Sequence, residues 1–244
     1  MRITQCLALI FSAILPLACA HAEVPAWRQE YLQRYALPDI YTKLVDDHGD
    51  GYAGLYGARN VREVIPGLVY RGGANNVYDK NGRRSNSNPL PVEGLQNFCK
   101  QGFANGVYLY STNYKTSPHA EDCAADHAGA GHFDYTQQSV LLYTSAQQAV
   151  LKMAYDTITG KTSGPMYLHC WNGWHASGYI SALILRQFCG FTGDQAVNYW
   201  DKNTDGNDVG SSEYNQIRQK IRAYVPDATM PLDAATQQAV CPAP

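Results

Sequence analysis

The stretch His169-Cys-Trp-Asn-Gly-Trp-His-Ala-Ser-Gly178 decides the fold, because it joins a predicted strand directly to a predicted helix. The apolar run Met166-Tyr-Leu-His169 is typical of a short buried strand, and Ala176 to Phe188 has apolar residues at helical spacing. This order places Cys170 beside the N-terminus of the helix. Free backbone N–H groups and the positive end of the helix dipole favour a thiolate there.

The same turn has the chemistry of an anion-binding loop. Backbone N–H groups at a helix N-terminus bind phosphate, and a glycine lets the chain bend tightly around it. We therefore predict that Cys170 is a nucleophile beneath such a loop. The alternative is an inert core thiol, because an unpaired cysteine packs as a small hydrophobic residue. The predicted loop consists of Trp171, Asn172, Gly173, Trp174, His175 and Ala176.

The segment resembles the signature loop of the cysteine-dependent tyrosine and dual-specificity phosphatases. In that family His-Cys is followed by five residues, an arginine and a serine or threonine. The matching residues here are His169, Cys170, Gly173, Ser177 and Gly178. The resemblance covers about residues 60–225, with weaker similarity at Leu68–Gly73, Glu93–Gly102 and Ala182–Trp200.

The resemblance implies a single α/β domain with a mostly parallel central sheet flanked by helices, similar to the dual-specificity phosphatases. It implies catalytic roles for Cys170 and Ser177 and a general acid upstream of the cysteine. Asp134 is the best placed candidate for that acid, and Asp122 and Asp126 are weaker ones. The implied ligand is a phosphorylated small molecule or protein, and no cofactor is expected.

One departure from the family pattern governs the functional prediction. Ala176 stands where the family has the arginine that grips two phosphate oxygens. Losing such a group costs about 3 kcal/mol of barrier, so activity is expected to be low or absent. The adjacent His175 is a candidate replacement cation, and Trp171 and Trp174 would make the mouth apolar. The chain is then a phosphate-ligand binder or weak phosphatase, or alternatively a catalytically dead scaffold.

Residues 1–22 have the pattern of a secretory signal peptide. Arg2 precedes an apolar run from Leu7 to Leu15, and the small residues before position 23 suit cleavage. A lipoprotein site at Cys19 is disfavoured by Pro16, which stands where leucine is usual. We expect a periplasmic or secreted protein with no integral membrane segment after cleavage.

The predicted mature chain has five cysteines, an odd number in an oxidising compartment. Cys170 is expected to be unpaired because its loop needs a free thiol. The expected bridges are Cys99–Cys123 and Cys189–Cys241.

A second constellation keeps metal binding open as an alternative function. His119, Cys123, His127 and His132 are spaced by four, four and five residues, and imidazole with thiolate suits zinc or copper. A bridge to Cys99 would remove the thiolate, and a solvated loop is the plainer interpretation. A rival metal site would use His169, Cys170 and His175.

Composition and local pattern complete the sequence predictions. The formal net charge is −2, and the only basic cluster is a loop with Lys80, Arg83 and Arg84, so nucleic acid is not expected as a partner. After the signal we expect an irregular lead (23–59), the domain (60–225) and a C-terminal tail (226–244). Within the domain we expect strands at 67–71 and 107–110, helices at 92–101 and 144–158, and a polar surface excursion at 111–132.

Overall fold

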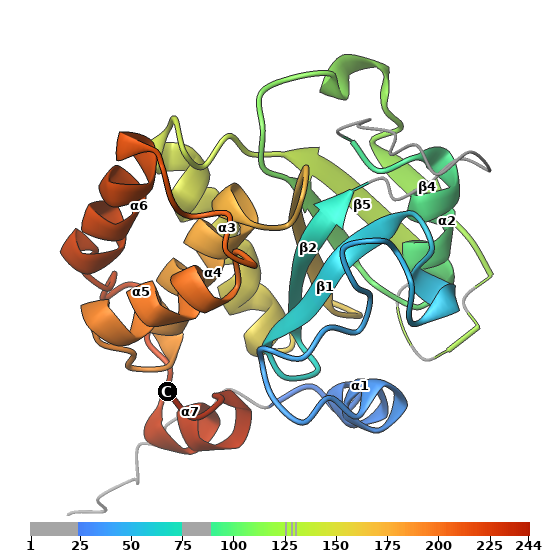
Figure 1. Cartoon of the computed structure of the whole chain (residues 1–244). Coiled ribbons are helices and arrows are strands. Elements are labelled where there is room, and N and C mark those ends of the chain that lie inside the picture. The colour runs from blue at the N-terminus through green and yellow to red at the C-terminus, as the bar shows by residue number, and fades with distance from the viewer. Residues whose placement is uncertain (1–23, 75–88, 125, 128, 130) are drawn as a thin grey trace, which may run out of the picture.

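A computed structural model describes residues 24–74, 89–124, 126–127, 129 and 131–244. The predicted signal peptide and the basic loop around Lys80 lie outside these residues. The described chain is built around one six-stranded sheet (Figure 1). Its strands, in spatial order, are β1 (Ala58–Ile65), β2 (Val69–Ala74), β6 (Met166–Cys170), β3 (Asn105–Tyr108), β5 (His132–Gln137) and β4 (Ala120–Asp122).

The four central strands are parallel, and each outer strand is antiparallel to its neighbour. The predicted α/β fold with a mostly parallel sheet is therefore confirmed. Strand β1 was not predicted, although its signal is present in the sequence. Pro66 and Gly67 are typical turn residues, and they stand between the apolar pairs Val64-Ile65 and Leu68-Val69, which suits a hairpin. The N–H of Leu68 donates to the carbonyl of Ile65 at 3.0 Å to close the turn.

Helices cover both faces of the sheet (Figure 1). One core is formed mainly by aliphatic side chains of α3, α4, α5 and α6 against the strands. The other is rich in tyrosine and phenylalanine, most of them from the strands and the rest mainly from α1 and α2. The predicted ends of α3 agree with the structure. The helices are α1 (Arg28–Tyr35), α2 (Val92–Lys100), α3 (Thr144–Ile158), α4 (His175–Phe188), α5 (Gly193–Lys202), α6 (Ser212–Ala223) and α7 (Ala234–Val240), with short 3-10 turns at Ala53–Leu55 and Tyr114–Thr116.

The lead and the tail both pack onto this body. In the lead, Tyr31 and Tyr35 of α1 are buried in the aromatic core, so the lead is less irregular than expected. In the tail, Val240 of α7 is buried in the aliphatic core. None of the helices in the described part of the chain has both the length and the apolar character needed to cross a membrane.

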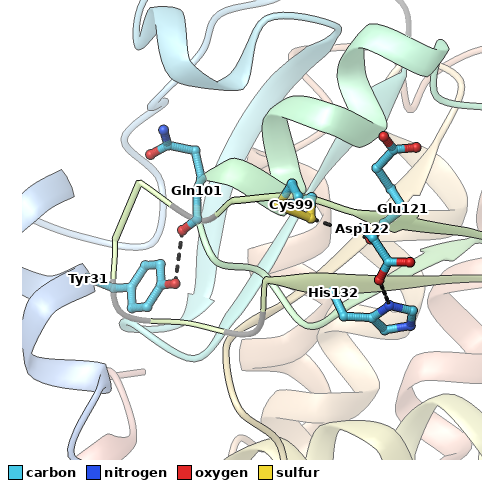
Figure 2. Close-up of a disulfide and its surroundings, with 7 residues drawn as sticks. Tyr31, Cys99, Gln101, Glu121, Asp122 and His132 are labelled. Atoms are coloured by element: carbon cyan, nitrogen blue, oxygen red, sulfur yellow. Dashed lines mark hydrogen bonds and ion pairs between the residues drawn. A yellow bond between two sulfur atoms is a disulfide. The ribbon is translucent and has the colours of Figure 1, made fainter.

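The cysteines pair as predicted from the sequence. Cys99 and Cys123 form a disulfide that joins α2 to the end of β4, with their Cα atoms 6.0 Å apart (Figure 2). Cys189 and Cys241 form the second, which joins the end of α4 to the end of α7. Cys170 is the free cysteine of the described residues, and it is buried.

Candidate functional site

Cys170 ends β6, and α4 begins at His175 after a four-residue turn. The Cys170 side chain is buried, and its Sγ lies 3.4 Å from the Oγ of Ser177, one turn into the helix. The N-cap residue Trp174 makes no side-chain capping bond, so no N-cap side chain occupies the N–H groups of the first turn. Strand, thiol, hydroxyl and helix N-terminus are thus adjacent, and the catalytic roles of Cys170 and Ser177 stay predictions.

The β1 strand holds the back of the loop. Arg59 Nε donates to the carbonyl of Trp171 at 3.2 Å, and Asn60 Nδ2 donates to the carbonyl of Asn172 at 2.7 Å. Arg59 is 1% exposed, and its Nη1 has no hydrogen-bond partner. Two successive loop carbonyls are therefore fixed from the side of the hairpin. These two residues were not predicted as part of the site, because their strand was not predicted.

Arg71 of β2 holds the next carbonyl. Its Nη2 donates to the carbonyl of Gly173 and also, at 3.3 Å, to the carbonyl of Asn203. Arg71 is fully buried, and its Nε and Nη1 have no partner. Gly173 has φ +79°, and a Cβ there would lie 2.7 Å from the backbone of Gly72. A side chain at position 173 would therefore strain the turn and collide with the strand.

Positive charge exceeds negative charge behind the loop. Arg59 and Arg71 form no ion pair with a carboxylate of the described residues. Arg62, also buried, pairs with Asp205 at 2.7 Å, and Lys43 pairs with the same carboxylate at 3.0 Å. Burial and the charge of Arg71 lower the pKa of Arg62 to about 10. Arg62 and Lys43 therefore share the carboxylate of Asp205, and Arg59 and Arg71 have no carboxylate partner among the described residues.

His169 orients the loop. Its Nδ1 lies 3.2 Å from the carbonyl of Cys170, which can only accept, so Nδ1 carries the proton. Nε2 then accepts from the hydroxyl of Tyr135 at 2.7 Å, and that hydroxyl accepts from the N–H of Leu90 at 2.9 Å. Burial lowers the pKa of His169 to about 3. The ring is neutral with both nitrogens bonded, so the rival metal site at the loop loses a ligand.

His175 faces a different partner from the one predicted. Its Nε2 lies 2.6 Å from the carbonyl of Asn207, and its ring stacks on Tyr214 of α6 with centroids 4.7 Å apart. The sequence analysis named this imidazole as a candidate cation for an anion bound at the Cys170 loop. Its contacts are instead with α6 and the connection before it, which argues against His175 as the replacement for the missing arginine.

The sheet register places Asp134 too far from Cys170 for a general acid, which corrects that prediction. Asp134 pairs with Asn105, and Asn105 pairs with Met166, which precedes Cys170 by four residues on the same strand. At about 3.3 Å per residue, the carboxylate is about 13 Å from the cysteine along the sheet. Asp122 lies at the same distant edge, opposite His132. The backbone N–H of Asp126 donates to the carbonyl of Lys100, on the α2 side of the molecule.

The predicted metal cluster does not form. Cys123 is in a disulfide, and a bonded sulfur is not a thiolate ligand. His119 stacks on Tyr114, His127 lies 3.5 Å from Glu30, and His132 contacts Asp122 and Asp134. Within the described ranges, no three His, Cys, Asp or Glu residues are arranged to hold a metal ion. His119 precedes the short strand β4, Cys123 and His127 follow it, and His132 begins β5.

Aromatic side chains line the mouth of the loop. Trp171 is 39% exposed, donates from Nε1 to the hydroxyl of Tyr108 at 3.2 Å, and lies 5.0 Å from the ring of Tyr110. Burial, together with the charge of Cys170, raises the pKa of Tyr110, so its hydroxyl stays protonated. Tyr108 ends β3 and Tyr110 follows it. The sequence signal for both was their place at the carboxyl end of a parallel strand.

A comparison with solved structures finds chains that are similar to this one. No known protein-family profile and no curated protein matches the sequence. One of these similar structures is the core catalytic domain of the PP-IP phosphatase SIW14 from S. cerevisiae in complex with citrate. The two chains are 14% identical with a TM-score of 0.44, and the match covers 70% of this chain and 88% of that one.

Proposed function

We propose that the Cys170 loop binds the anionic group of a phosphorylated ligand and hydrolyses it weakly or not at all. The observation that carries this is the excess of buried positive charge behind the loop. Arg59, Arg62 and Arg71 are each at most 2% exposed, and Asp205 is their only ion-pair partner among the described residues. An uncompensated buried charge costs several kcal/mol, which an anion at the loop would offset.

The residues at the loop suit binding better than turnover. In a phosphatase reaction the Cys170 thiolate would form a bond to phosphorus while the bond from phosphorus to the leaving oxygen breaks. That oxygen needs a proton, and Asp134 is too distant to supply it. Ala176 provides no bidentate clamp for the transition state. Cys170 and the proposed anion loop would still bind the ligand, whereas the two groups that would speed the reaction are not in place.

We also propose that the protein is exported from the cytoplasm. The two disulfides support an oxidising compartment, because such bonds persist outside the cytoplasm. With the predicted signal peptide, they favour a periplasmic or secreted protein whose ligand is met outside the cytoplasm. A catalytically dead scaffold is the alternative, and it predicts no affinity for phosphate.

The deciding experiment measures phosphate binding by calorimetry and aryl phosphate hydrolysis on the mature protein, with a Cys170→Ser variant beside it. We expect saturable phosphate binding in both proteins, slow hydrolysis in the wild type and none in the variant. Absence of phosphate binding would overturn the proposed function in favour of the scaffold. Hydrolysis that survives in Cys170→Ser would remove the thiol from the reaction.

A further inference from the structure

The connection between α5 and α6 contacts the front of the Cys170 loop. The part of this connection that makes the contacts is residues 203–208, called the 203–208 segment below. The indole Nε1 of Trp174 donates to Asp205 Oδ2 at 3.0 Å, and the imidazole of His175 donates to the carbonyl of Asn207 at 2.6 Å. Two adjacent residues at the start of α4 are thus bonded to this one segment.

The segment also reaches the loop through Arg71. The carbonyl of Asn203 accepts from Arg71 Nη2, the same nitrogen that donates to the carbonyl of Gly173. Asn203 is 1% exposed and Thr204 is fully buried, so this part of the segment is fixed in the core. The segment therefore acts on three consecutive loop residues, two directly and one through Arg71.

Asp205 is the centre of these contacts. Its Oδ1 accepts from Arg62 Nη2 at 2.7 Å, and its Oδ2 accepts from Lys43 Nζ at 3.0 Å as well as from Trp174. Asp205 has φ +54°, in the left-handed region that side chains seldom adopt. Three donors from separate parts of the chain hold the carboxylate that contacts the loop.

The far end of the segment is held independently. Arg218 of α6 pairs with Asp208, and its Nε lies 2.8 Å from Asp201. These bonds attach the segment to α6 rather than to the loop. Asp208 is therefore a matched control for Asp205: it is a carboxylate paired with an arginine in the same segment, but its arginine belongs to α6.

We propose that Asp205 is a positioning residue of the Cys170 loop, acting through Trp174. The inference deepens the proposed function, since the loop that it positions is the proposed anion site. By fixing the N-cap residue of α4, Asp205 sets the direction of the first-turn N–H groups that would meet the anion. Removing the indole donor of Trp174 should loosen residues 171–176 and leave the rest of the fold in place. Removing Asp205 should loosen the same residues, and it also leaves the buried Arg62 without its carboxylate partner.

The test combines hydrogen exchange of the peptide covering residues 171–177 with phosphate calorimetry. The variants are Asp205→Ala, Trp174→Phe, the double variant, and Asp208→Ala as the control. We expect Trp174→Phe to raise loop exchange and to lower phosphate affinity, each by about tenfold, the effect of losing one hydrogen bond to a charged group. Asp205→Ala should raise loop exchange as well, while its effect on phosphate affinity also includes the charge of Arg62 that it leaves unpaired. In loop exchange the double variant should match Asp205→Ala, because Trp174→Phe then removes no further bond to the carboxylate.

The possible outcomes separate a positioning role from a general loosening of the fold. Unchanged loop exchange in both single variants, an equal effect of Asp208→Ala, or additive effects in the double variant would overturn the positioning role. Faster exchange across the whole chain would also overturn it, because it would show general destabilisation. If the wild type does not bind phosphate while loop exchange responds as expected, the proposed function fails and the positioning role stands.

Discussion

The two ends of the central parallel strands carry titratable residues in opposite arrangements. At the carboxyl end, around Cys170, the cations Arg59 and Arg71 are buried and have unused donors. At the amino end, the imidazole of His132 lies between the carboxylates of Asp122 and Asp134, and all three side chains are largely exposed. Residue type alone therefore does not locate a site. Burial combined with unbalanced charge distinguishes the two ends.

The amino end is electrostatically satisfied as it stands. Hydrogen bonds that the imidazole of His132 donates to the carboxylates of Asp122 and Asp134 raise the pKa of His132, so both carboxylates have the same imidazole as their partner. Exposed pairs of this kind contribute little, because water and salt screen them. The buried guanidinium groups of Arg59 and Arg71, at the other end, have no carboxylate partner among the residues that the structure describes.

The largest expected effect is a gain of activity at the carboxyl end. Ala176→Arg should raise aryl phosphate turnover by about a hundredfold, because it restores a bidentate donor at the transition state. Steady-state kinetics of the two proteins measure it, with the Cys170→Ser form of each as the background rate. No gain in a variant that still folds and binds phosphate would show that more than the arginine is missing.

The next effect concerns stability at the amino end. Replacing Cys99 and Cys123 together by alanine should lower the free energy of unfolding by about 3 kcal/mol, through the loop that the bridge closes. Denaturant unfolding measures this, and phosphate affinity under native conditions should not change. Lost phosphate affinity in the folded variant would show that the two ends are coupled.

A smaller effect is expected from the buried charge. Arg71→Met should weaken phosphate binding by about tenfold or more, because it removes the hold on Gly173 and one uncompensated cation. Asp134→Asn serves as the amino-end control and should bind phosphate like the wild type. Equal loss in both variants, measured by calorimetry, would erase the distinction between the two ends.

The smallest effect is the pH dependence from His132. Its pKa is raised in the folded protein, so its contribution is complete below the unfolded value near 6.5 and disappears as pH rises through the folded value. Thermal unfolding at pH 6 and pH 9 should show His132→Gln losing about 0.5 kcal/mol at the lower pH only. Strong salt should abolish the difference, and a difference that persists in salt would indicate a buried interaction.

The sequence predicted those parts of the site that depend on local order. The strand, the turn and the helix around Cys170 follow one another in the chain, so spacing was enough to place Cys170 beside Ser177. The helix at 144–158 had a clear apolar stripe, and the odd cysteine count left Cys170 unpaired. These inferences needed no knowledge of how distant segments pair.

The predictions that failed all concerned side chains whose positions depend on contacts between segments far apart in the sequence. The register of β5 against β3 places Asp134 at the wrong end, and no local pattern encodes that register. The direction of His175 is set by Asn207 and Tyr214, which lie on a later connection and helix. Arg59 was overlooked because a charged side chain in a short strand looks exposed until its neighbours are known.

The close contact between the hairpin and the turn has a consequence for sequence change over time. A Cβ at Gly73 would lie 2.6 Å from the carbonyl oxygen of Trp171, and one at Gly173 would lie 2.7 Å from the backbone of Gly72. The backbones at Gly72-Gly73 and at Gly173 thus lie so close together that neither segment has room for a side chain. A substitution on one side is accommodated only if the other side retreats, so the two motifs should be inherited as a unit. Their joint presence gives a two-part signature for finding diverged relatives that a search with the Cys170 turn alone would miss.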